Sequence, residues 1–536
     1  MKDKVRARLF GRLDLRGSMR VLAIGLAAVI VVIAAASAAR AADDSSATIS
    51  TLRKQIEALQ QQGQQNQQLI EELKKRVADL EAKKPAAEAT PAPKAPESPE
   101  SALDRAVEDI NVPATPTTKA ASSDLASVKA GKAEIKLIDI SMDILVAGGA
   151  SSAPPSQIPI LQGGDHDPSR NGFSLQQAEI SASGAVDPYF YGESHIVFKE
   201  DGVEIEEAFA TTLNIPAVQF KAGYYLTEFG RTNATHPHTW DYITQPVPIT
   251  RMFGGDGQRG CGVRIGWLMP TPWYSQLLVN MQNATGEQMP SFLGTPNGAV
   301  AAYQDAGALS TAGYKIGIAG RPIFDRGVDK AGDFVYSGRW ENSWSPGDSS
   351  VLLGFSGERG PNETGLQGYA WIYGADFLVR WRPAVNEYGW PFISWQTEFI
   401  GRDYHAQEFT ANGIPTGTAK GTPLTTNVNL PARDFNDWGV FSILTWGFVR
   451  DWALTLRGEY ATAIDTDSAD RLARKLDPLR DDRTRLAAAF IFNPTHFSRL
   501  RLEYDHDIAT HLKTGEANSV WLSLEILYGA HPAHNF

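Results

Sequence analysis

The sequence is nearly free of cysteine, has no excess of basic residues, and has no long apolar run after its first forty or so residues. Its single cysteine, Cys261, excludes an intramolecular disulfide, and its distance from the N-terminus excludes a lipid-anchoring role. The 61 acidic residues outnumber the 50 Lys and Arg, and the net charge of −11 argues against nucleic acid as a partner, because phosphate binding requires a basic surface. At 536 residues the chain is too long for one ordinary soluble domain, so at least two structural regions are expected.

Sequence motifs of the common enzyme classes are also missing. There is no nucleophile elbow, no phosphate-binding glycine loop and no zinc-hydrolase helix motif. The glycine-rich segment 254–257 precedes a strand pattern rather than a helix, which indicates a loop. We therefore expect no enzymatic activity; a Ser/His pair in a loop is the alternative that leaves hydrolase chemistry open.

Residues 1–41 have the pattern of a signal peptide. Seven Lys and Arg residues within residues 1–20 precede an uncharged apolar run over 21–36. Small-residue sites at 36–38 and 39–41 then fit signal-peptidase cleavage, which predicts export. The alternative is an uncleaved inner-membrane anchor, because the apolar run approaches the length that spans a bilayer.

Residues 46–83 have the heptad pattern of a coiled coil, with Ile, Leu or Val at eight of ten consecutive seam positions. The pattern favours a dimer and leaves a trimer open, and a single amphipathic helix is the alternative. We expect this coiled coil in the periplasm, with peptidoglycan or a periplasmic protein as a partner. The Pro- and Ala-rich residues 84–132 cannot bury a core and are expected to form an extended linker.

From residue 133 onward, apolar and polar side chains alternate every two residues. Leu500 and Leu502, for example, alternate with Arg499, Arg501 and Glu503. In an outer-membrane barrel this alternation places the apolar side chains against lipid and the charged ones in the lumen. The pattern predicts 16 strands, near residues 134–147, 172–184, 188–199, 203–213, 216–227, 258–270, 273–284, 328–344, 348–358, 368–382, 390–402, 434–449, 451–462, 481–493, 497–508 and 516–528.

The connections between these strands differ in length by parity. Those after even-numbered strands are tight, whereas most after odd-numbered strands are long: 148–171, 228–257, 285–327, 403–433 and 463–480. A barrel with both termini in the periplasm requires short turns at one rim and long loops at the other. The sequence therefore predicts an all-β transmembrane barrel of antiparallel strands over residues 133–536, embedded in outer-membrane lipid of a Gram-negative-type cell. Aromatic residues near strand ends fit interfacial girdles, and Phe536 resembles the terminal signal read by the barrel-assembly machinery.

A barrel of about sixteen strands is wide enough for a water-filled channel, and no segment is suited to be a plug domain. The expected function is a porin for passive diffusion of small hydrophilic solutes. Loop 228–257 is the expected constriction, with the candidate residues Arg231, His236, His238, Asp241 and Arg251. The alternation directs into the lumen Lys221, Arg264, Arg339, Arg380, Arg382, Arg457, Arg499 and Arg501, together with Glu341, Asp376, Glu398, Glu459, Glu503 and Asp505. The slight excess of basic side chains favours anions, but interior ion pairs would produce the same pattern.

The coiled coil, the linker and the predicted strands together resemble the phosphate-selective porin family. That resemblance implies a homotrimeric, passive anion channel. The lumen ladder of arginines with lysines at the constriction, which this family uses for phosphate, is not evident in the sequence, so phosphate specificity does not carry over.

Several short motifs resemble a second group of outer-membrane proteins, described as zinc-regulated or receptor-like. These motifs are Asp201-Gly202-Val203-Glu204, Phe229-Gly230-Arg231, His236-Pro237-His238, Asp256-Gly257, Pro270-Thr271-Pro272-Trp273-Tyr274 and Gly529-Ala530-His531-Pro532-Ala533-His534. This resemblance implies a metal-linked receptor or uptake protein as the alternative function. The chain has neither the plug nor the energy-coupling box of an energised receptor.

Three residues of loop 228–257 are candidate metal ligands. His236, His238 and Asp241 are close enough in sequence to share a zinc ion, for which imidazole and carboxylate are good ligands. The alternative is that both histidines have a structural role in the loop and bind no metal. Apart from this zinc, no cofactor is expected. His531 and His534 are expected at the opposite, periplasmic rim, too far from loop 228–257 to complete this site. Cys261 is interpreted as a small apolar filler.

Overall fold

A computed structural model describes residues 127–130, 133–136, 138–161, 163–294, 317–318, 321–324, 326–419, 422–463, 482–510 and 512–529. The predicted signal peptide and coiled coil lie outside the described residues, as does the linker up to residue 126. The end of the linker forms β1 (Ser127–Ala130), which pairs with β2 (Ala133–Lys136) in a separate two-stranded sheet. Residues 134–136, predicted as the start of the first barrel strand, therefore belong to this hairpin.

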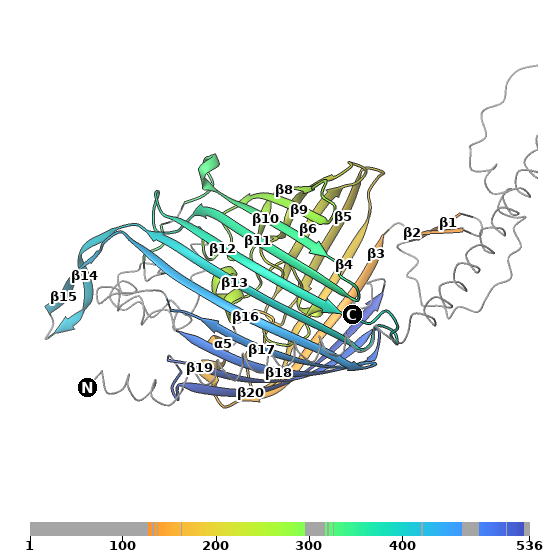
Figure 1. Ribbon diagram of the computed structural model, residues 1–536. Helices are drawn as coiled ribbons and strands as arrows, with labels where there is room; N and C mark the ends of the chain where they lie inside the picture. The colour runs from red at the N-terminus through yellow and green to blue at the C-terminus, as the bar shows by residue number, and fades with distance from the viewer. Residues whose placement is uncertain are drawn as a thin grey trace, which may run out of the picture. The chain divides into compact units, whose positions relative to one another are not determined.

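Sixteen antiparallel strands form one closed barrel, as predicted, and Figure 1 shows them tilted side by side. They are β3 (Asp139–Ser151), β4 (Gly172–Ala185), β5 (Phe190–Phe198), β6 (Val203–Thr212), β7 (Val218–Leu226), β8 (Arg259–Leu268), β9 (Tyr274–Asn283), β10 (Phe334–Trp344), β11 (Ser349–Pro361), β12 (Tyr369–Trp381), β13 (Phe392–Ala406), β16 (Arg433–Val449), β17 (Trp452–Ala461), β18 (Arg483–Thr495), β19 (Ser498–Ala509) and β20 (Glu516–Gly529). The last strand, β20, closes the barrel against β3, with Leu524 opposite Val146. Closure leaves no unpaired strand edge within the wall.

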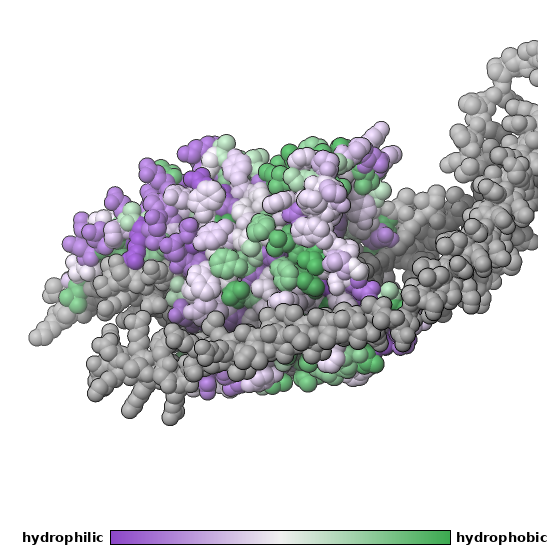
Figure 2. All heavy atoms as spheres, in the orientation of Figure 1, coloured by the Kyte–Doolittle hydropathy of each residue, from purple (hydrophilic) through white to green (hydrophobic). Residues whose placement is uncertain are grey.

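The pleat of each strand separates an apolar outer face from a polar inner face. On β20, Val520, Leu522 and Leu524 are exposed on the outside, whereas Ser523 and Glu525 are fully buried on the inside. Figure 2 shows hydrophobic side chains over the middle of the visible wall and hydrophilic ones gathered toward the end where β14 and β15 extend. An apolar exterior around a charged interior is the reverse of a soluble protein and is typical of a barrel embedded in lipid. Among the described residues, no helix has the length and apolar character needed to cross a membrane.

The connections follow the predicted parity except for 382–391, which is longer than the tight turn predicted there. β16 and β17 are joined by residues 450–451 alone, whereas β3 and β4 are separated by 152–171, and β7 and β8 by 227–258. The long connections contain η1 (Pro155–Gln157), α5 (Ile158–Leu161), η2 (Pro237–Thr239), α6 (Val247–Phe253) and η5 (Ala331–Asp333). β14 (Phe409–Ala419) and β15 (Thr422–Leu430) form a hairpin between β13 and β16 that the sequence did not predict.

The described residues include a large apolar cluster enclosed by the barrel. It combines apolar residues between positions 229 and 253 and between positions 284 and 293 with residues of the wall, among them Ala370 of β12, Ile400 of β13 and Phe441 of β16. Phe253, at the end of α6, packs on Phe229 with a ring-centroid distance of 5.0 Å. Gly254 follows the last residue of α6, and its φ of 86° is a conformation that other residues adopt only with strain. This cluster gives the inner loops a hydrophobic core of their own.

Candidate functional site in the lumen

The connection 227–258, here called loop three, enters the lumen. Its Gly230 amide donates to Ser356 Oγ of β11 at 3.1 Å, and its Thr232 amide donates to Glu398 Oε1 of β13 at 2.9 Å. Further along the loop, the Val247 amide donates to Glu459 Oε2 of β17 at 2.6 Å. These acceptors are inward-facing and lie on three separate strands. Loop three therefore crosses the lumen and is fixed to its wall at several points.

A group of arginines on β17 and β19 holds the backbone of loop three. Arg501 Nη1 donates to the carbonyl oxygens of Trp240 at 2.7 Å and Tyr242 at 3.0 Å, and Arg499 donates to the carbonyl of His238. Glu525 of β20 balances both guanidiniums at 2.6 and 3.1 Å. A guanidinium has donors in several directions, so each arginine binds a carboxylate and a loop carbonyl at once.

Most of the other predicted lumen charges also lie inside the barrel in ion pairs. Lys221 and Arg264 share Glu228 at 3.0 and 2.7 Å, and Arg339 contacts Asp376 at 2.5 Å and Glu341 at 2.8 Å. These pairs neutralise the cations locally.

Three more predicted residues lie in loop three, on the wall strand β19 and in a turn, respectively. Arg251, in α6, donates to the carbonyl of Thr462 at 2.5 Å. Glu503 accepts hydrogen bonds from the Ile243 and Thr244 amides at 2.5 and 3.1 Å. Arg382 lies just after the end of β12, in the turn 382–391, rather than on the barrel wall.

Arg231 of loop three and Arg380 of β12 form the exception to this pairing. Burial lowers the pKa of Arg231 below its ordinary value, and the charge of Arg380 is the second cause of this shift. The two guanidiniums therefore lie close enough to interact electrostatically. Among the described residues, no ion pair or hydrogen bond to either guanidinium is found, and Glu341, Glu398 and Asp376 act on Arg231 only at longer range. Two like charges without a direct partner make this part of the lumen locally positive.

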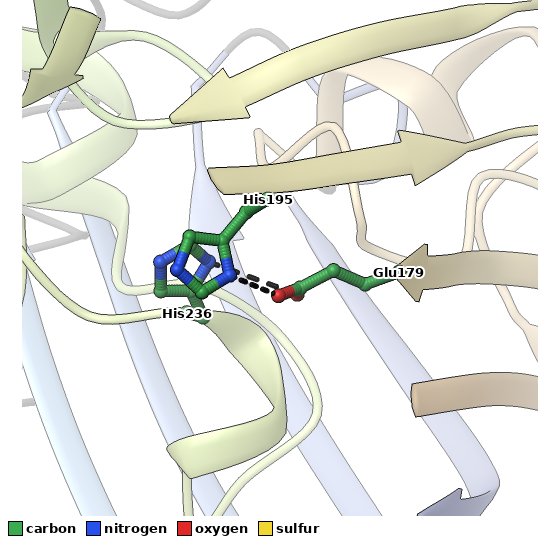
Figure 3. A group of neighbouring side chains, drawn as sticks. All are labelled: Glu179, His195 and His236. Atoms are coloured by element: carbon green, nitrogen blue, oxygen red, sulfur yellow. Dashed lines mark hydrogen bonds and ion pairs between the residues drawn. The ribbon is translucent and has the colours of Figure 1, made fainter. Parts of the chain in front are cut away.

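A second feature of the lumen is a cluster of histidine and glutamate side chains, shown in Figure 3. His195 Nδ1 of β5 lies 2.7 Å from Glu179 Oε1 of β4, and His236 Nδ1 of loop three lies 3.7 Å from Glu179 Oε2. Glu179 is completely buried, and one ligand atom from each of the three residues lies within 4.8 Å of the others. The three side chains come from separate segments and could hold a metal ion.

Further carboxylates surround His236. Its Nδ1 lies 3.1 Å from Glu206 Oε2, and its Nε2 lies 2.9 Å from Glu207 Oε2, both on β6. Burial alone would lower the pKa of His236, but Glu206 and Glu179 raise it well above its ordinary value. The cluster therefore favours a positive charge, carried either by a proton or by a metal ion.

Of the predicted metal ligands, the structure brings His236 and His238 together, with their rings stacked at a centroid distance of 5.5 Å. Asp241 is placed elsewhere, with its carboxylate 3.7 Å from Arg499. Sequence reasoning missed Glu179 and His195. Their only sequence signal is that they occupy inward positions on adjacent strands.

Two further sequence candidates lie away from this cluster. Cys261 is exposed on β8, on the same outward face as Val263, which fits a small filler of the outer wall. His166, Glu204 and Asp256 form another group that could hold a metal ion. Lys199 and Arg259 already contact Asp256 at 3.2 and 3.3 Å, which disfavours another cation there.

Comparisons with known proteins do not assign this chain to a family. No family model matches it. An uncharacterized protein of Aquifex aeolicus is 27% identical over 384 residues, which make up 68% of this chain and 71% of the relative. Solved structures that resemble the fold include the outer membrane channel DcaP of Acinetobacter baumannii, which is 13% identical with a TM-score of 0.41 and covers 73% of this chain and 98% of the other. Pseudomonas putida OprB is 11% identical with a TM-score of 0.42 and covers 73% of this chain and 94% of the other. An anion-selective porin from Comamonas acidovorans is 7% identical with a TM-score of 0.38, covering 73% and 99%. At these values the likeness carries no argument about function, which has to rest on the barrel's own geometry.

Proposed function

We propose that this protein is an outer-membrane porin, in which small hydrophilic solutes diffuse passively through a lumen that loop three narrows. The observation that carries the proposal is the path of loop three, which crosses the inside of a closed barrel and is bonded to β11, β13 and β17. A barrel of about sixteen strands leaves room for an aqueous channel, and its narrowest ring sets what passes.

The preferred solutes of this porin are anions. Wall arginines such as Arg339, Arg457 and Arg499 lie against carboxylates, so these pairs contribute little net field. Arg231 and Arg380 are the exception, and Arg231 belongs to the loop that forms the constriction. A cationic pair at the narrowest ring attracts anions and repels cations.

The assembly we propose is a homotrimer in the outer membrane, with residues 46–83 as a periplasmic coiled coil. The apolar outer face of the barrel supports the membrane location, and the heptad pattern supports self-association.

Planar-bilayer recording of the purified full chain tests the porin. The expected result is stepwise conductance in groups of three, with larger steps for a variant whose loop three is shortened by removing residues 234–254. Bilayers that stay silent with both proteins would contradict the porin. Equal steps from both proteins would show that loop three does not form the constriction.

The alternative predicted from the sequence is a zinc-linked receptor or uptake protein. The cluster of Glu179, His195 and His236 is the observation that favours it. Metal binding in this cluster is equally compatible with a porin and can be tested independently of transport.

A further inference from the structure

We propose that Glu179, His195 and His236 bind one divalent transition-metal ion, zinc being the best match, and that this ion ties loop three to the barrel wall. The ligand atoms lie within 4.8 Å of one another. Around a four-coordinate zinc ion, with metal–ligand distances near 2.0–2.2 Å, the ligand atoms stand about 3.3–3.5 Å apart. Small side-chain movements would therefore complete the coordination.

The second ring nitrogen of each histidine is held in the way that metal sites require. His195 Nε2 lies 2.9 Å from Glu193 Oε1, and His236 Nε2 lies 2.9 Å from Glu207 Oε2. A carboxylate on one nitrogen fixes the proton there and leaves the other nitrogen, Nδ1, as a neutral ligand. In both histidines that Nδ1 faces Glu179. The same arrangement on two histidines from different segments is a stronger indication than either contact alone.

A fourth ligand is available from two directions. Glu206 Oε2 lies 3.1 Å from His236 Nδ1, and His238 Nδ1 lies 3.4 Å from Glu179 Oε2. Either side chain would complete a tetrahedral site with mixed nitrogen and oxygen ligands. Such a set suits zinc, whereas Mg²⁺ and Ca²⁺ prefer oxygen ligands alone.

The charge of the surroundings also favours a cation. Glu179 contacts both histidines, Glu193 contacts His195, and Glu206 and Glu207 contact His236. Glu179 and Glu206 are almost completely buried. Buried carboxylates are costly to keep unless a positive charge balances them. A metal ion would supply that charge and would cross-link β4, β5 and loop three. This site does not depend on whether solutes pass through the barrel.

Calorimetric titration of the detergent-solubilised, chelator-treated full chain with ZnCl₂ tests the site. His531→Ala and His534→Ala are introduced throughout, so that the tail histidines contribute no heat. One zinc ion per chain is expected to bind. His195→Ala and His236→Ala should each weaken binding at least tenfold, and Glu193→Gln, which touches only the outer nitrogen of His195, should weaken it about 10–100-fold.

The matched control is His405→Ala. His405 also contacts a carboxylate, Asp434 at 2.6 Å, but it does not belong to either of the groups that could hold a metal ion among the described residues. Zinc binding by this variant should equal that of the parent protein. The proposal is overturned if the parent takes up no zinc, or if the His195→Ala/His236→Ala double variant binds zinc as tightly as the parent.

A second measurement covers the case in which the alanine variants do not fold. Cobalt(II) added to the parent protein should give the strong visible absorption of four-coordinate cobalt, and zinc should abolish it. Zinc should also raise the temperature at which the folded barrel loses its fast mobility on an SDS gel, because a ligand that binds only the folded state stabilises it. If neither effect is observed, no metal ties loop three to the wall.

Discussion

Arg457 of β17 binds Thr244 of loop three twice, donating to its backbone carbonyl and, at 2.6 Å, to its hydroxyl, across 213 residues of sequence. The same guanidinium lies 2.8 Å from Glu459 and 3.4 Å from Glu503, and all of these groups are buried. One wall arginine thus balances two carboxylates and anchors the loop that crosses the lumen.

Arg457→Met is expected to lower the free energy of unfolding by about 3–5 kcal/mol, because it leaves two buried carboxylates without their cation. The measurement is urea unfolding of the protein refolded into lipid vesicles. Arg170→Met is the control, since Arg170 contacts Glu200 at 2.6 Å with both side chains largely exposed. Little change is expected there, because solvent screens an exposed pair. A similar loss in both variants would contradict the anchoring role of Arg457.

Arg231→Ala and Arg380→Ala are each expected to shift ion selectivity from anions toward cations, because each removes a lumen cation that has no direct partner among the described residues. The measurement is the reversal potential in a planar bilayer under a salt gradient. Arg170→Ala, outside the lumen constriction, should leave that potential unchanged. An unaltered potential in the double variant would remove this pair as the selectivity determinant.

Gly230→Ala is expected to loosen loop three. Gly230 has a φ of 59°, and a Cβ placed on it would lie 2.3 Å from Glu398 Oε2. Gly347 is a matched control with the same φ of 59° and nothing within 4 Å of its Cβ position. Both variants incur the left-handed strain of about 1–2 kcal/mol, and the contact with Glu398 should add about 1–3 kcal/mol at position 230 alone. If Gly230→Ala and Gly347→Ala change the free energy of unfolding equally, loop three accommodates the added Cβ at position 230 without any further loss of stability.

Glu363, in the connection between β11 and β12, provides a pH dependence. Burial raises the pKa of Glu363 from 4.5 to about 8. The hydrogen bond that Glu363 accepts from the Ile318 amide at 2.8 Å lowers this pKa, but by less than burial raises it. Because the pKa in the folded state exceeds that in the unfolded state, the stabilisation is complete below about pH 4.5 and is lost as the pH rises through about 8. Hydrogen exchange at the Ile318 amide, corrected for the intrinsic effect of pH, should accelerate over this range. Glu363→Gln should abolish the acceleration, and a persistent pH effect in that variant would assign it to another group.

The sequence by itself determined the barrel. The two-residue period of a strand decides which side chains face lipid and which face the lumen, and this period is a local property of the chain. On β19, for example, Leu502 is exposed, whereas Arg501 and Glu503 are buried. The sorting of short and long connections is equally visible in the sequence. The hairpin of β14 and β15 was missed because its polar, Gly- and Thr-containing strands lack apolar alternation.

Only the tertiary structure decided which inward-facing residues meet. Glu179, His195 and His236 come from β4, β5 and loop three, and Arg231 of loop three comes within electrostatic range of Arg380 of β12. Asp241, a neighbour of His236 in sequence, is directed instead to Arg499. Alternation predicts that a side chain points into the lumen. Its partner there depends on the strand register, the closure of β20 on β3 and the path of loop three. None of these is encoded in a local pattern.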